Sequence, residues 1–171
     1  RDWSSDVCSS DLIEGANTDI RVSYSPVVVQ HWNYGRLSAD YSDKVNLKEV
    51  RELKLNSVSS NVVLGKVAGK ATVTNNFGTL SIDQISDGFQ TIDISVENGE
   101  VDCTLPQAPY AISVNETTSG FQYPKSLKLT ATKKNGGNAY TGYHLNKVDG
   151  KTISKIGRAH VWTPVTNEDR V

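Results

Sequence analysis

The segments VNLKEV (residues 45–50), VVLGKV (62–67) and LSIDQI (80–85) decide the fold. Each carries an apolar residue at its first, third and sixth positions, and the segments start 17 and then 18 residues apart. VDCTL (101–105) repeats the first part of this pattern 21 residues after LSIDQI, with the extra length near Asp87 and Gly88. A turn-forming segment precedes each one: DYSD (40–43), SVSS (57–60), NNFGT (75–79) and ENGE (97–100). A period near 20 residues with apolar alternation is typical of a stacked solenoid.

Alternation with a period of two favours strands over helices throughout the chain. The segment nearest to a helical pattern is KVNLKEVREL (44–53), and it also fits a period of two better. A rung of about 18 residues cannot bury its apolar face alone, so neighbouring rungs stack around a shared core. We therefore predict an all-β fold, a single-stranded parallel β-solenoid (β-helix) of short rungs. An antiparallel β-sandwich is the alternative, because it also has short strands separated by turns.

The region after Pro106 departs from the repeat. The segment KKNGGNAYTGYH (133–144) lacks the pattern of a buried strand, which predicts a mobile hairpin or a long loop. A last strand is expected near Val148 to Ile153.

Composition excludes several classes of protein. The 171 residues include 18 Lys and Arg against 19 Asp and Glu, a formal net charge of −1, so there is no basic footprint for nucleic acid. No apolar run approaches the roughly 20 residues of a transmembrane helix. Two cysteines are too few for a disulfide framework, and no glycine-rich phosphate-binding motif occurs. We expect no cofactor, no nucleic-acid partner and no transmembrane segment.

The two ends of the chain look foreign to the rest. Residues 1–12 (RDWSSDVCSSDL) and 155–166 (KIGRAHVWTPVT) can be encoded by one DNA string read on opposite strands, with Trp162 at a TGA codon. That string resembles a short-read sequencing adapter, and such segments are excluded before fold reasoning. We therefore expect residues 1–12 and 155–171 to be adapter-derived and peripheral in the structure. Residues 13–154 would form the repeat domain, truncated at both ends.

The weak candidates for a binding site lie together in QHWNYG (30–35). His31, Trp32 and Tyr34 could form an aromatic platform for a sugar ring or a protein surface. The alternative, which we favour, is a cap that covers the first rungs, where Trp and Tyr bury large areas.

Motifs for catalysis and metal binding are missing. There is no Gly-x-Ser-x-Gly elbow, and the acids between residues 83 and 102 recur at no fixed rung position. His144 has no ligand partner at metal spacing, and Cys103 alternates with Val101 and Leu105, which predicts a core position. We expect no catalytic residue, no metal site and no enzymatic activity.

The repeat units carry a family resemblance. LSADYSDKVNLKEV, LNSVSSNVVLGKV and VTNNFGTLSIDQI, with GFQYP and YTGYHLNKVDGKTIS further on, are similar to bacterial cell-envelope proteins. These are the adhesin-type β-strand-repeat proteins abundant in Bacteroidetes-type bacteria, and the resemblance covers residues 17–154. It implies a secreted or surface-located β-solenoid of no known enzymatic activity. We therefore expect a non-enzymatic adhesive or structural module at the outer surface of the cell envelope or secreted, with a surface glycan or a protein as partner. The alternative function is a polysaccharide-processing β-helix enzyme.

Overall fold

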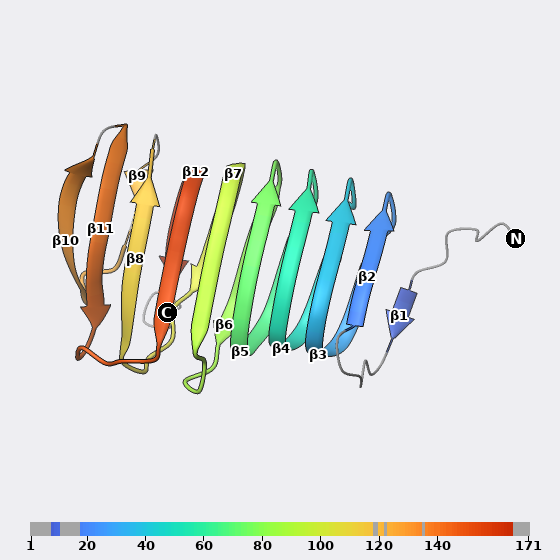
Figure 1. Ribbon diagram of the computed structural model, residues 1–171, viewed down its shortest axis with the longest axis horizontal. Helices are drawn as coiled ribbons and strands as arrows, with labels where there is room; N and C mark the ends of the chain where they lie inside the picture. Colours follow the sequence, from blue (N-terminus) through green and yellow to red (C-terminus); the bar gives the residue numbers. More distant parts are fainter. Residues whose placement is uncertain (1–7, 11–17, 118–119, 122, 135, 166–171) are drawn as a thin grey trace, which may run out of the picture.

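A computed structural model describes residues 8–10, 18–117, 120–121, 123–134 and 136–165. This part of the chain contains strands and no helix, and it forms a β-solenoid of about five turns with mostly parallel strands (Figure 1). The predicted β-solenoid is therefore confirmed, and the alternative, an antiparallel β-sandwich, is wrong.

The long strands each supply both sides of one rung. β3 (Val27–Asp40), β4 (Val45–Val58) and β5 (Val62–Asn76) stack in parallel. β7 (Thr91–Thr104) pairs with β5 through its first half and with β6 (Thr79–Ile85) through its second half. At the N-terminal end, β2 (Thr18–Ser23) and β1 (Cys8–Ser10) both pair with β3.

The register of the strands is the one that the repeat predicts. Val45 pairs with Val62, and Val62 pairs with Leu80. Leu80 pairs in turn with Val101, across the longer interval. All four side chains are buried, so one apolar column runs through successive rungs. Because a shift of one residue would turn every apolar side chain outward, this column holds the register.

Each rung bends at one corner and turns at the opposite one. The bend of β3 lies near Asn33, between the buried residues Trp32 and Leu37, and β4 shows a register irregularity between Val50 and Glu52 at the equivalent place. The turn between consecutive long strands contains a residue with positive φ, such as Tyr41 (53°) before β4. Its backbone N–H donates to a carbonyl of the next rung, from Tyr41 to Val58 at 2.8 Å.

The C-terminal part closes the solenoid with strands out of sequence order. β8 (Tyr110–Glu116), β10 (Leu127–Lys134) and β11 (Gly137–His144) form an antiparallel group. β12 (Thr152–Val165) returns and lies between β7 and β8, parallel to both, and also pairs with β9 (Gly120–Phe121) (Figure 1). Residues 133–144 are thus the end and second arm of a regular hairpin rather than a long loop. The last strand begins at Thr152, a few residues after the expected start.

The position of β12 corrects one expectation. Residues 155–157 are not peripheral, because they lie in a strand flanked on both sides and Lys155 is 1% exposed. Lys155 stands beside Ile94 and Val114, at a position where the other rungs place apolar residues. Residues 1–7, 11–12 and 166–171 lie outside the described part, as do the side chains of residues 8–10 and 158–165.

Candidate binding surface at the bend of the rungs

Trp32 lies in the core and offers no ring face to a ligand. Its side chain is 1% exposed, and its register partner in the next rung is the buried Val50. The indole Nε1–H donates to the backbone carbonyl of Glu52 at 3.2 Å, which satisfies the polar tip of the ring. The structure thus removes Trp32 from the candidate platform and makes it an interior residue at the bend.

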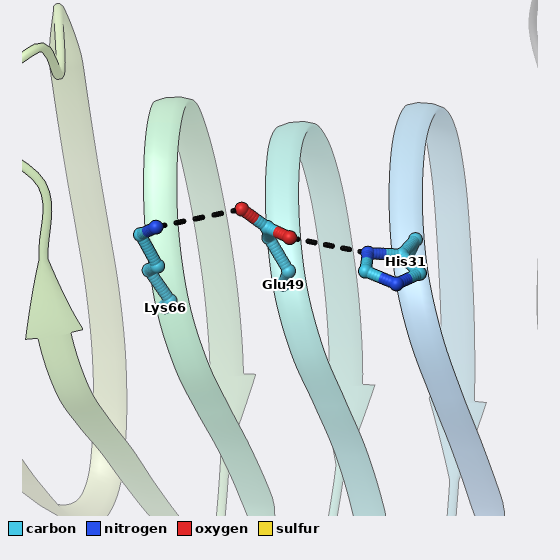
Figure 2. A network of polar contacts seen from close by, with 3 residues as sticks. All are labelled: His31, Glu49 and Lys66. Carbon is cyan, nitrogen blue, oxygen red and sulfur yellow. Dashed lines mark hydrogen bonds and ion pairs between the residues drawn. The ribbon is translucent and has the colours of Figure 1, made fainter.

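His31 faces outward and begins a row of three polar side chains, which we call the charged ladder. His31, Glu49 and Lys66 occupy the same position in β3, β4 and β5 (Figure 2). His31 Nδ1 and Glu49 Oε2 are 3.1 Å apart, and Lys66 Nζ lies 3.6 Å from Glu49 Oε1. The two contacts use different oxygens of one carboxylate, so Glu49 links three consecutive rungs. All three side chains are about half exposed, so the ladder contributes little to stability.

Tyr34 lies at the other side of the bend, in an open depression of about 660 Å³. Its ring is 43% exposed, which leaves one part free for contact with a ligand. Glu52 and Lys70 follow Tyr34 in register, and their charged groups are 4.0 Å apart. We call this hollow the Tyr34 depression; Asp19, Arg36 and Lys54 also line it.

The Tyr34 depression contains two basic groups that form no ion pair among the described residues, although Asp19, which faces Arg21, stands opposite Arg36 in register. Arg36 and Lys54 are adjacent in register, so two cationic side chains start from neighbouring strands about 4.8 Å apart. Across the described residues, neither side chain forms an ion pair, and both are exposed. Like charges directly opposite one another in a sheet are destabilising, and an anion placed between them relieves that repulsion.

The structure places the three predicted residues, His31, Trp32 and Tyr34, in different surroundings and brings further residues to the candidate site. Trp32 points inward, while His31 and Tyr34 point outward on either side of the bend. Glu49, Lys66 and the charged lining of the Tyr34 depression were not predicted from the sequence. One signal for Glu49 and Lys66 was available, because they are 17 residues apart and occupy equivalent places in VNLKEV and VVLGKV.

Two other residues that the sequence singled out, Cys103 and His144, lie in buried surroundings. Cys103 is buried, and burial, with a smaller contribution from Asp102, raises the pKa of its thiol to about 12. His144 is 8% exposed, its ring stacks on Tyr110 at 5.3 Å, and its Nδ1 lies 3.3 Å from the carbonyl oxygen of Ala108. No group of three or more His, Cys, Asp and Glu side chains in the described ranges could hold a metal ion.

The fold and the site together define a β-solenoid with an open, charged depression at one corner. In comparisons with known proteins, no family model matches the chain, and no curated protein or solved structure matches it either. Within the residues that the structure describes, there is no helix of the length and apolar character that a membrane span requires.

Proposed function

We propose that this protein is a non-enzymatic module of the bacterial cell envelope, at the outer surface or secreted, which adheres to an acidic surface polymer. The location rests on the resemblance of the repeat units to envelope adhesins. The binding role rests on one observation, the adjacent Arg36 and Lys54 beside the exposed ring of Tyr34 in one depression. A stacked solenoid holds such groups on strands that are already ordered, so contact with a ligand requires little further ordering.

The chemistry of the Tyr34 depression matches an acidic sugar. A uronate carboxylate can accept charge-assisted hydrogen bonds from Arg36 and Lys54, while the apolar face of the sugar ring packs on Tyr34. Glu52 already faces Lys70 at 4.0 Å, so this pair leaves the other two cations for the ligand.

The alternative, a polysaccharide-processing enzyme, also finds support in this depression. Asp19 and Glu52 are two carboxylates that share it with basic residues and a tyrosine. A glycosidase, however, keeps its acid in apolar surroundings, and the side chains of Asp19 and Glu52 are 51% and 50% exposed. The depression therefore favours binding over hydrolysis.

Calorimetry with polygalacturonate oligomers tests the proposal. The wild-type protein should bind them with an affinity that falls as salt rises, and Arg36→Gln with Lys54→Gln should weaken binding about tenfold or more. Lys48→Gln is the matched control, because Lys48 is an exposed lysine of the same strand on the side before the bend. No binding by the wild type, or equal affinity in the double variant, would overturn the proposal. Shortening of the oligomers during incubation would favour the enzyme instead.

A further inference from the structure

The turns between rungs carry a row of exposed aromatic side chains, which we call the aromatic turn column. Tyr24, Tyr41 and Phe77 are 77%, 52% and 52% exposed. Each residue directly follows the end of a strand (β2, β3 or β5), and each donates its backbone N–H to the rung that follows. They therefore occupy equivalent positions along one edge of the solenoid, at the corner opposite the bend.

The backbone of this position is left-handed in every turn. φ is 55° at Tyr24, 53° at Tyr41 and 58° at Phe77, and Ser59 and Asn98 hold the same conformation in the other two turns. The cause is the hydrogen bond between rungs, which spans 3.0 Å from Tyr24 N to the carbonyl oxygen of Asp40 and 2.9 Å from Phe77 N to that of Glu97. Glycine and asparagine adopt this region easily, whereas a bulky residue there is a genuine outlier.

Core packing does not account for the aromatic side chains at these positions. The rings of Tyr24 and Tyr41 stack at 5.2 Å with an angle of 8° between their planes, yet both remain more than half exposed. Phe77 is equally exposed and has no ring partner in the described part of the chain. Backbone strain of this kind is concentrated at functional sites, where the surrounding structure maintains it.

The surroundings of the aromatic turn column select the ligand. The turns before β12 carry Asp40, Asp43, Glu97 and Glu100 against one base, Lys44, and a second base, Arg158 of β12, pairs in register with Glu97. This acidic edge repels phosphate, sulfate and uronate groups. The turns also carry hydroxyl and amide side chains, among them the exposed Asn61, whose Oδ1 accepts hydrogen bonds from the backbone N–H and the hydroxyl of Thr79 (3.3 and 3.0 Å). Exposed rings beside hydrogen-bonding groups match a sugar, which has an apolar C–H face and hydroxyls at its rim.

We propose that the aromatic turn column is a second binding site, which takes a neutral polysaccharide laid along the edge of the solenoid. The rings contact the C–H faces of the sugars, and the turn side chains contact the hydroxyls. This inference deepens the adhesive function proposed above and rests on it, but it assigns a different ligand to a different corner.

Asparagine variants test the site without endangering the fold. Tyr24→Asn, Tyr41→Asn and Phe77→Asn place at each turn a residue that accepts positive φ, as Asn98 already does. We expect the triple variant to melt at the same or a higher temperature than the wild type and to lose tenfold or more affinity for neutral oligosaccharides. The probes are a β-glucan and a mannan fragment, measured by calorimetry.

The control variant is Tyr123→Ala, which removes an exposed ring (43%) that belongs to neither proposed site and should leave neutral-sugar affinity unchanged. Equal affinity in the triple variant, or no binding of either fragment by the wild type, would overturn the second site. The polygalacturonate measurement reports separately on the Tyr34 depression, so failure of one site is distinguished from failure of the adhesive function.

Discussion

Exchanging Trp32 for phenylalanine separates a structural role from a binding role at the bend of the rungs. The substitution removes the hydrogen bond from the indole to the carbonyl of Glu52, worth about 1 kcal/mol. It also removes about 50 Å² of ring from a fully buried site, which at about 25 cal/mol per Å² is roughly 1 kcal/mol more. Trp32→Phe should therefore lower the free energy of unfolding by about 2 kcal/mol.

Urea unfolding followed by far-ultraviolet circular dichroism measures this change. With a slope of about 2 kcal/mol per molar urea, the midpoint should fall by about 1 M. The folded variant should bind polygalacturonate oligomers as the wild type does, because Trp32 is enclosed. Tyr34→Ala should show the reverse, with stability within about 1 kcal/mol of wild type and clearly weaker binding.

An exchange of these effects on stability and binding between the two variants would refute both assignments. A Trp32→Phe protein of wild-type stability that has lost binding would mean that the indole contacts the ligand directly. It would restore the aromatic platform and contradict the burial of Trp32.

Three further perturbations follow from buried groups and close contacts. In a Cys8→Ser background, Cys103 should not react with a thiol reagent at mildly alkaline pH until denaturant is added, since burial raises its pKa to about 12; rapid reaction of the folded protein would refute this. Burial lowers the pKa of Lys155, and Glu116 opposes part of that shift, so Lys155→Met with Glu116→Gln should stabilise the fold by about 1–4 kcal/mol in urea titrations near neutral pH. Because the pKa of Lys155 is depressed in the folded state, its destabilisation of the fold is complete at pH values below that pKa and shrinks as pH rises toward 10.5. A double variant less stable than wild type would contradict this, as would a stability difference between the two proteins that widens with pH. Gly35→Ala should destabilise by about 1–3 kcal/mol, because φ is 139° and a Cβ would clash with the carbonyl oxygen of Thr18; an unchanged melting temperature would show that β2 moves away freely.

The core of the solenoid was predictable because its inward positions share one pattern, an apolar residue that recurs every 17 or 18 residues. Val45, Val62 and Leu80 recur at nearly one spacing and pair in the structure as that spacing requires. Trp32 obeys the same rule, since it stands 18 residues before its partner Val50. Its aromatic character suggested a platform, but its place in the period indicated the core.

The outward positions show no such recurring residue type, so the lining of the Tyr34 depression could not be predicted from the sequence. Arg36, Lys54 and Thr72 share one column of the sheet, yet nothing in their identities marks them as neighbours. The place of β12 was equally hidden, because a strand's own sequence does not say which two strands it will join. Aromatic residues inside turns were visible in DYSD and NNFGT, but their strain emerges only from the backbone angles.

The insertion of β12 between β7 and β8 has a consequence for the order of assembly during synthesis. Chain growth delivers β2 to β7 in the order in which they stack, so each rung can add to the one before as it leaves the ribosome. β8, β10 and β11 emerge next, but their link to the rungs is the later β12. Until those last residues emerge, the edge of β7 is open to other chains, and ribosome stalling after residue 144 should therefore promote aggregation.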